Sequence, residues 1–274
     1  MLPGRPLHGN WKNPELAWLG LKSRHLVSRK EDSIMAESDL EHWADKEFAR
    51  HYLNAADVII LGRRTSLAML KSFYRHFLEH REGNRVLDLG CGDGILIRTL
   101  LETDNSITAT LVDGSEDMLK EAQERLASFG NMRFLKVTFQ ELLNMNVQLP
   151  DFDLVVSSLA IHHLTNSERK ALFRYVHSHL VEGGYFVNID CVIAPVEEIE
   201  KWYIRFWEEG MVEKLNELEV NLDYRDIMQK YLGKDHYSKI DTLAGQMAAL
   251  EALGFQDVDC FYKRGMFAMY GGRK

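Results

Sequence analysis

The chain has 274 residues, of which 46% are hydrophobic and 27% charged, the balance of a folded globular protein. This length accommodates one large domain or two small ones with a well-buried core. No apolar run approaches the ~18 residues that a membrane span needs. The formal net charge of -8 argues against non-specific nucleic-acid binding, because lysine and arginine must neutralise the phosphates.

The cysteines indicate the cellular compartment. Cys91, Cys191 and Cys260 are far apart in the sequence, and none belongs to a CxxC pair. This arrangement fits neither a disulfide framework nor a zinc knuckle. We therefore expect a protein of the reducing cytoplasm with no bound metal.

The N-terminal segment differs in composition from the rest. Residues 1–34 carry six Lys/Arg against three Asp/Glu, without the continuous apolar core of a signal peptide. We expect a flexible extension over 1–37, with a transit segment as the alternative, and the folded domain over 38–274. That domain opens with a capping box, Ser38 to Glu41, which predicts a helix start.

Apolar strands then alternate with helices. This alternation predicts βαβ units and a parallel sheet that is covered on both faces. The expected strands are 85–89, 107–112, 132–137, 152–157 and 185–189, and the expected helices are 65–80, 95–101, 116–126 and 168–180, the last ending at Gly183-Gly184.

The C-terminal third breaks this rhythm with a helical insert at 195–239. A helix at 243–253 follows, and then two strands at 257–262 and 266–270, which are joined so closely that they must form an antiparallel hairpin. The expected fold is α/β and Rossmann-like: a doubly wound, mostly parallel seven-stranded sheet with an antiparallel C-terminal hairpin and a helical insert.

The strongest motif is the glycine-rich stretch VLDLGCGDG at 86–94, which follows a strand and opens a helix. Its glycines allow a tight turn and a close approach of ligand to backbone. The dinucleotide pattern GxGxxG requires a small residue where this chain has Ile95. Asp88 and Asp93 also add negative charge where a pyrophosphate would lie, so the motif favours a cationic ligand. Asp113 ends the second strand and could accept both hydroxyls of a ribose.

Together, the stretches 88–94 and 111–113 resemble the class I S-adenosylmethionine-dependent methyltransferases. The similarity continues through 152–164 and 180–186. The closing segment 267–274 is similar to the small-molecule branch of that family, the branch of ubiquinone and menaquinone biosynthesis. The resemblance implies S-adenosylmethionine as the cofactor.

The resemblance also implies a cofactor site. Asp88 and the first glycines would hold the methionine end, Asp113 the ribose, and Gly114 and Met118 the adenine side. Thr138 stands where the family commonly has an acid, so either its hydroxyl accepts the adenine hydrogen bond or Phe139 packs against the ring instead. The full set is Asp88, Gly90, Cys91, Gly92, Asp113, Gly114, Met118, Thr138, Phe139, Ser157 and Leu159.

Methyl transfer from a sulfonium mainly requires alignment of the reacting atoms, and a base helps only if the nucleophile must lose a proton. His162 and His163 follow the fourth strand at the ligand-binding edge, so they are the candidates for this base. The alternative is that they cap or pack a loop. Asp190 ends the fifth strand near the same mouth, and Cys191 is expected to be a small apolar filler.

The insert carries an aromatic stripe at helical spacing. It is either ordinary core or a lid over an aromatic or hydrophobic acceptor. The stripe comprises Ile199, Trp202, Tyr203, Phe206 and Trp207, and the candidate substrate residues are Asp190, Trp202, Phe206, Trp207 and Tyr237.

The expected function is methyl transfer to an O, N or C nucleophile of a small organic acceptor. One alternative is a tRNA-modifying enzyme that uses S-adenosylmethionine or a modified form of it. Another is a regulatory module that binds the cofactor without turnover, and Ile95 disfavours a nicotinamide dehydrogenase. The sequence specifies neither the acceptor nor the oligomeric state.

Overall fold

The computed structural model describes residues 56–274 except 82, 145–148, 220–223, 226–227 and 229–238. All described residues belong to one compact unit, 37–274. The expected extension at 1–37, the helix after Ser38 and the candidate substrate residue Tyr237 lie outside the described residues. No helix in the described part is long and apolar enough to cross a bilayer.

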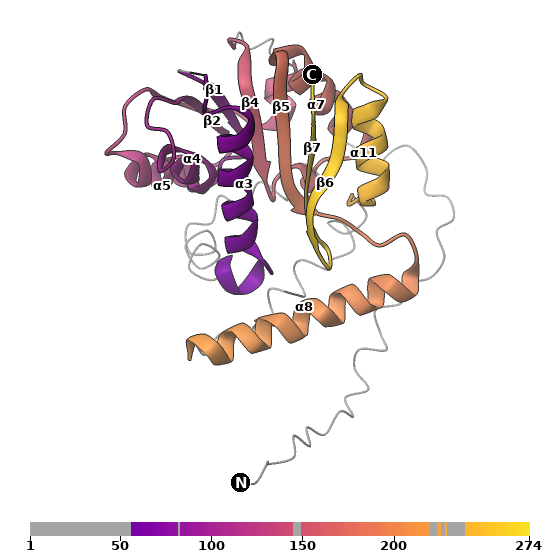
Figure 1. Ribbon diagram of the computed structural model, residues 1–274. Helices are drawn as coiled ribbons and strands as arrows, with labels where there is room; N and C mark the ends of the chain where they lie inside the picture. The colour runs from indigo at the N-terminus through magenta and orange to yellow at the C-terminus, as the bar shows by residue number, and fades with distance from the viewer. Residues whose placement is uncertain (1–55, 82, 145–148, 220–223, 226–227, 229–238) are drawn as a thin grey trace. The chain divides into compact units, whose positions relative to one another are not determined.

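One seven-stranded sheet forms the centre of the unit, with the strand order β3-β2-β1-β4-β5-β7-β6 (Figure 1). Strands β1 to β5 are parallel, and β7 runs antiparallel between β5 and β6. This arrangement confirms the predicted Rossmann-like α/β fold. The strands are β1 Arg85–Leu89, β2 Thr108–Asp113, β3 Met132–Lys136, β4 Phe152–Ser158, β5 Leu180–Cys191, β6 Gln256–Arg264 and β7 Phe267–Arg273.

Helices cover both faces of the sheet, because side chains alternate between the two faces along each strand. In β1, Val86 packs in the core on one face and Leu87 in the core on the other. The Val86 face is covered by α3 Arg63–Phe77, α4 Ile95–Leu101 and α5 Glu116–Leu126; the Leu87 face is covered by α6 Phe139–Asn144, α7 Asn166–His179 and α11 Leu243–Glu251.

The chain reverses its winding direction at the centre of the sheet. From β1 it proceeds outward through β2 and β3, then returns to place β4 on the other side of β1. In open α/β sheets, ligands bind at the carboxyl ends of the strands beside such a switch point. The loops after β1 and β4 are therefore where the fold places a binding site.

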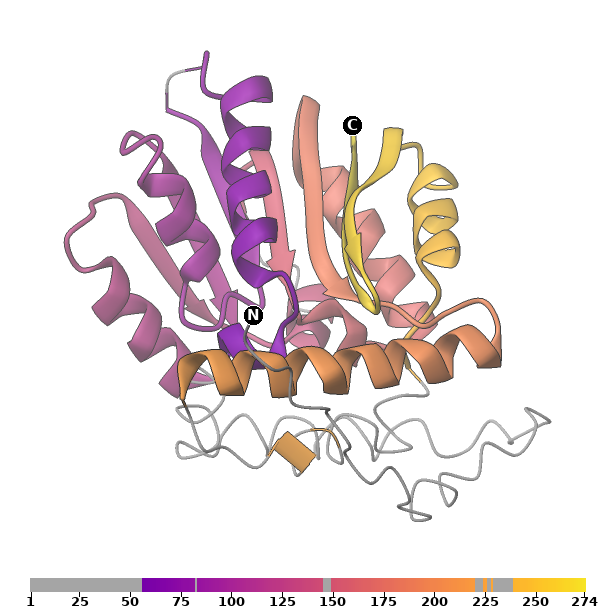
Figure 2. The ribbon, with the colours of Figure 1, turned by 60° about the horizontal axis from the view of Figure 1, so that its bottom comes forward.

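A long helix, α8 Glu197–Leu218, crosses the carboxyl edge of the sheet (Figure 2). Its inner face repeats every four residues: Trp207, Met211 and Leu215 are buried. The Trp207 indole N–H donates to the backbone oxygen of Ile59 at 2.7 Å. The buried ring thus helps to anchor α8, and the assignment of Trp207 as a substrate residue stays a prediction.

The rest of the predicted stripe on α8 is divided between its inner and outer faces. Trp202 is 57% exposed and Ile199 is 38% exposed, so these two residues do not belong to the buried face. Tyr203 and Phe206 are half-buried. The spacing correctly predicts a helix but not which of its residues are buried, because that depends on contacts with residues distant in the sequence.

One further expectation is corrected by the structure. Gly183-Gly184 does not end a helix: α7 already ends at His179, and both glycines lie inside β5. The pairing of β4 with β5 is irregular there, and Gly183 has φ 73°. The short helix α6 was not expected, because six residues are too few for a periodic pattern.

Candidate active site

The glycine loop joins β1 to α4 in a left-handed conformation. Gly90, Gly92 and Gly94 have φ values of 66°, 52° and 74°. A Cβ atom on Gly90 would lie 2.3 Å from the Cβ of Ala160, whereas one on Gly92 would meet nothing within 4 Å. The loop therefore closes against the segment after β4 and leaves its backbone open at Gly92.

Asp113 connects this loop to the next helix. One carboxylate oxygen accepts the Gly92 N–H at 2.9 Å, and the other accepts the Ser115 N–H at 2.8 Å. Burial raises the pKa of Asp113, although both amide hydrogen bonds oppose that change. The carboxylate expected to hold a ribose thus also fixes the loop.

Asp88 is the most unusual group at the site. It is fully buried, and neither carboxylate oxygen has a hydrogen-bond partner in the described part of the chain. Burial raises its pKa well above the ordinary value, and the carboxylates of Asp113 and Asp93 add to the effect. A buried carboxyl group without a partner is costly, and a cationic group beside it would offset that cost.

Asp93 differs from Asp88 because it has a counter-ion. The Arg125 side chain forms an ion pair with the Asp93 carboxylate, and its Nε–H donates to the Asp93 backbone oxygen at 2.9 Å. Asp93 therefore adds less negative charge to the site than the sequence suggests. Arg125 lies on α5, 32 residues away, so sequence reasoning missed this pair.

The residues expected at the adenine moiety differ in their surroundings. Thr138 precedes α6, where its amide and hydroxyl donate to Glu141 at 2.8 and 3.0 Å. Its hydroxyl also accepts the Glu141 N–H at 3.1 Å, so Thr138 caps α6. Phe139 reaches the glycine loop: its ring lies 3.3 Å from the position of a Cβ on Gly90. Cys91, within the loop, and Met118, on α5, are both buried, and Gly114 is partly exposed.

The end of β4 is held tightly to its neighbours. The Ser157 hydroxyl donates to the backbone oxygen of Leu89 at 2.7 Å and is fully buried, so it ties β4 to β1. Leu159 has φ 50°, which a leucine rarely adopts, and its N–H donates to Ile189 at 2.9 Å. Such strain is typical of functional sites. This turn leads into the 3-10 helix η2, Ile161–His163.

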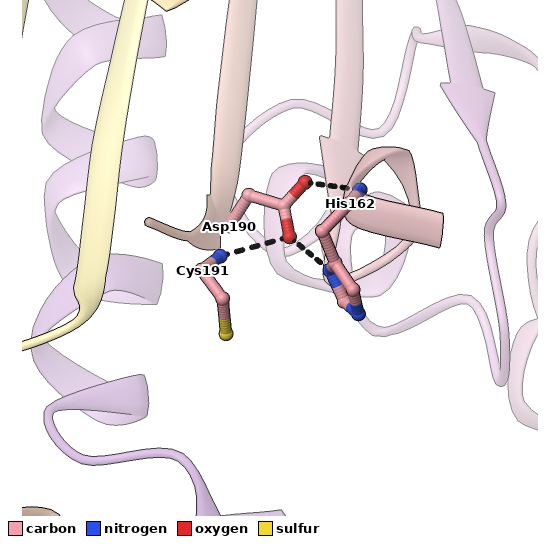
Figure 3. A group of neighbouring side chains, drawn as sticks. All are labelled: His162, Asp190 and Cys191. Atoms are coloured by element: carbon pink, nitrogen blue, oxygen red, sulfur yellow. Dashed lines mark hydrogen bonds and ion pairs between the residues drawn. The ribbon is translucent and has the colours of Figure 1, made fainter. Parts of the chain in front are cut away.

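Three buried polar side chains meet between η2 and the end of β5 (Figure 3). The Asp190 carboxylate accepts the backbone N–H of His162 at 3.1 Å and that of Cys191 at 2.9 Å, and it pairs with the Nδ1 of His162. Ligand-type atoms of all three lie within 4.8 Å of one another. These residue types also bind transition metals. The expectation of no metal stays a prediction.

A second layer of polar groups supports Asp190, and the sequence did not reveal it. Asn188 donates to the Asp190 carboxylate at 3.4 Å and to the Tyr270 hydroxyl at 2.8 Å. The Tyr270 hydroxyl in turn donates to Gln246 on α11. All four residues are buried. The available signal was Asn188 itself, a polar residue inside an otherwise apolar strand.

On α8, the described substrate candidates lie beside the β6–β7 turn. The Lys263 ammonium donates to the Tyr203 hydroxyl at 2.5 Å and lies 4.0 Å from the ring centroid. The Phe206 ring lies 3.0 Å from the position of a Cβ on Gly265. Trp202 contacts the Phe206 ring with a centroid distance of 5.9 Å. The structure thus places Trp202 and Phe206 beside the hairpin turn, whereas Asp190 lies with the histidines.

Residues 86–184, which carry the glycine loop, Asp113 and the His162 segment, match the methyltransferase domain family. The match covers less than half of the chain, and it shows that this part is similar to methyltransferase domains. The fold of the described unit is the Rossmann-like α/β fold that the sequence motifs predicted. The finer expectation, the ubiquinone and menaquinone branch, stays a prediction.

Known proteins similar to this chain include an uncharacterized methyltransferase of Anoxybacillus flavithermus. It is 28% identical over 141 residues, which span 51% of this chain and 62% of the relative. A carboxy-S-adenosyl-L-methionine synthase of Methylococcus capsulatus is 27% identical over 184 residues, 65% of this chain and 72% of the relative.

Among solved structures, the magnesium protoporphyrin IX methyltransferase of Synechocystis, with bound S-adenosylhomocysteine, has a TM-score of 0.57 and 16% identity. The match covers 87% of this chain and 98% of that one. At this identity, the likeness concerns the fold alone.

Proposed function

We propose that the protein is an S-adenosylmethionine-dependent methyltransferase that transfers a methyl group to an O, N or C nucleophile of a small organic acceptor. The observation that carries the proposal is Asp88, a fully buried carboxyl group without a partner in the described chain, beside the open backbone of Gly92. A cationic ligand at this position would compensate the buried charge.

S-adenosylmethionine fits these residues. Its ammonium group would be held by Asp88, its ribose hydroxyls by Asp113, and its adenine by Phe139 with Gly114 and Met118. When bound, the cofactor supplies an electrophilic methyl group on a positively charged sulfur. The chain contributes alignment and exclusion of water at the carboxyl edge, which α8 covers (Figure 2).

The acceptor would enter between the glycine loop and the His162 segment. The base, where the acceptor needs one, would be His162 or His163. Helix α8 would then take part in choosing the acceptor from the hairpin side, through Trp202 and Phe206.

Titration calorimetry of the full chain tests the proposal. S-adenosylmethionine is expected to bind, and reduced nicotinamide is not. Asp88→Asn is expected to weaken binding at least about tenfold, because the charge-assisted hydrogen bonds to the ammonium are lost. Glu124→Gln, at an exposed position on α5, is the matched control. Unchanged affinity in a folded Asp88→Asn protein would contradict the assignment.

The similarity to a carboxy-S-adenosyl-L-methionine synthase supports a second candidate, a reaction on the cofactor itself. Mass spectrometry of ligands that copurify with the protein separates the candidates. An altered cofactor mass favours the second, while S-adenosylhomocysteine with a methylated product favours the first. Cofactor binding without transfer to any acceptor would favour a regulatory module, and salt-sensitive RNA binding would favour the tRNA-modifying alternative.

A further inference from the structure

The ion pair between Arg125 and Asp93 carries an inference that rests on the proposed function. We infer that Arg125 is a positioning residue for the cofactor: through Asp93 it holds the glycine loop in the shape that receives the ligand, and it offsets the Asp93 charge beside Asp88. Arg125 lies in the last turn of α5 and is not among the residues that the sequence predicted for the site.

The end of the glycine loop is attached to α5 and to the residues just before that helix. The Gly92 N–H donates to the Asp113 carboxylate at 2.9 Å. A Cβ atom on Gly94 would lie 3.2 Å from the Cβ of Ala122, so α5 packs closely against the loop at this position. Helices α4 and α5 lie side by side (Figure 1). The position of the loop therefore depends on α5.

Asp93 lies between these two contacts, and Arg125 holds it. The Arg125 guanidinium forms an ion pair with the Asp93 carboxylate, and its Nε–H donates to the Asp93 backbone oxygen at 2.9 Å. One side chain thus restrains both the side chain and the main chain of the same loop residue. A planar guanidinium presents several N–H donors in a fixed arrangement, which a lysine ammonium does not reproduce. The contact therefore requires an arginine.

The second effect of Arg125 is electrostatic. The Asp93 side chain is 6% exposed, so water screens its charge poorly. Burial raises the pKa of Asp88, and the carboxylates of Asp113 and Asp93 raise it further. The positive charge of Arg125 opposes the part of this effect that comes from Asp93. Loss of Arg125 with Asp93 kept in place would therefore raise the pKa of Asp88 further.

The other groups that face Asp88 add little charge. Asp88 lies in register with Leu111 on β2 and Val156 on β4, so the neighbouring strand positions are apolar. Burial raises the pKa of the Cys91 thiol well above its ordinary value, so the thiol stays neutral near pH 7. Within the described part of the chain, Arg125 is the one cation that forms an ion pair with the acids around Asp88.

Titration calorimetry of the full chain with S-adenosylmethionine tests the inference. Arg125→Gln is expected to weaken binding about tenfold, because the loop loses its charge-assisted hydrogen bonds. Arg125→Lys keeps the charge but not both contacts, so it should lose less. Arg98→Gln is the matched control. Arg98 is the ionisable residue of α4, forms an ion pair with Glu102, and has a side chain that is 37% exposed, like that of Arg125.

The pH dependence of binding distinguishes this role from a purely structural one. The ligand ammonium stays protonated below about pH 7.5, so affinity should rise with pH as Asp88 ionises. Arg125→Gln should move this rise to higher pH, because the Asp93 charge is no longer offset. Asp93→Asn should move the rise to lower pH, because that charge is removed, and the double variant should not show the upward shift. A purely structural role would weaken binding without moving the rise.

Two results would overturn the inference while leaving the proposed function intact: native affinity in Arg125→Gln, or shifts of the pH dependence in the same direction in Arg125→Gln and Asp93→Asn. Circular dichroism shows whether each variant is folded. If Arg125→Gln does not fold, Arg125→Lys decides, and native affinity in that variant would overturn the inference. Failure of the native protein to bind S-adenosylmethionine at any pH would instead contradict the proposed function.

Discussion

At the scale of single residues, the site contains two carboxyl groups that differ in their hydrogen bonds to the protein. Asp113 accepts two backbone hydrogen bonds, whereas Asp88 has no partner in the described chain. The first is organised before any ligand arrives. Burial of Asp88 without a partner lowers the stability of the ligand-free protein, and a cationic ligand would remove this loss. Such a loss is expected where function and stability compete.

Asp88→Asn is therefore expected to stabilise the ligand-free protein. The folded-state pKa of Asp88 is raised, so its contribution to stability is present below the unfolded pKa and is lost as pH rises through the folded pKa. At pH 7 the neutral amide should raise Tm by at least about 2–4 °C, the shift that about 1 kcal/mol produces in a domain of this size. Calorimetric scans at pH 4 and pH 7 check this, and a Tm gain as large at pH 4 would contradict it.

Asp113→Ala is expected to lower cofactor affinity at least about tenfold, because the ribose loses its acceptor and the Gly92 amide loses its anchor. Asp113→Asn keeps one side-chain oxygen and should lose less. Titration calorimetry measures both variants, with circular dichroism to show that each is folded. Equal affinities for Asp113→Ala and the native protein would remove Asp113 from the cofactor site.

At the scale of elements, α8 packs at the carboxyl edge through a buried face that includes Trp207. Its ring is fully buried and lies 6.3 Å from the Phe267 ring, and its indole donates to Ile59. Trp202, one and a half turns earlier, is 57% exposed. The same residue type on one helix thus provides a matched comparison between anchoring and exposed positions.

Trp207→Ala is expected to lower the free energy of unfolding by about 3–5 kcal/mol, because a large buried ring is lost and a cavity remains. Trp202→Ala should change it by no more than about 0.5 kcal/mol. Denaturant titrations of both variants give the comparison. Equal losses in the two would mean that α8 is not held by Trp207.

In this chain, the local sequence pattern predicts the bounds of helices and strands far better than it predicts which side chains come into contact. The bounds of β1, α4 and α5 were predicted because each is a short apolar or amphipathic run ended by clear turn residues. The inner face of α8 was not, because Trp202 and Trp207 are the same residue type on one helix, and contacts distant in sequence, such as those of Trp207 with Ile59 and Phe267, distinguish them. The strand through Gly183-Gly184 was missed because its irregularity depends on pairing with β4.

In the candidate site, too, the local sequence pattern marks some residues but not the partners that they contact. Asp88 and Asp113 could be predicted because the glycine motif and strand ends mark them. The supporting partners could not, since Arg125 lies 32 residues from Asp93 and Tyr270 lies 82 residues from Asn188. Such pairs arise from the strand order, which local periodicity does not specify.

At the scale of the described unit, the parallel sheet explains why residues so distant in sequence meet. Each parallel strand ends at the same edge, so the loops after β1, β2, β3 and β4 converge on one side. The opposite edge carries the returns from helix to strand, such as 102–107 and 127–131. A ligand of this site therefore contacts one edge alone.

Cofactor binding should consequently slow amide hydrogen exchange more at the carboxyl edge of the sheet than at the opposite edge. At one hundred times the Kd, a ligand stabilises the fold by about 2.7 kcal/mol, or about 5–10 °C in Tm. Hydrogen exchange should slow most at 90–94, 113–115 and 158–163, because these loops open locally without ligand and are held when it binds. Residues 102–107 and 127–131 should exchange as before, since their opening breaks no ligand contact. Mass spectrometry with and without S-adenosylmethionine measures both sets, and protection of the 102–107 edge alone would place the site on the wrong side of the sheet.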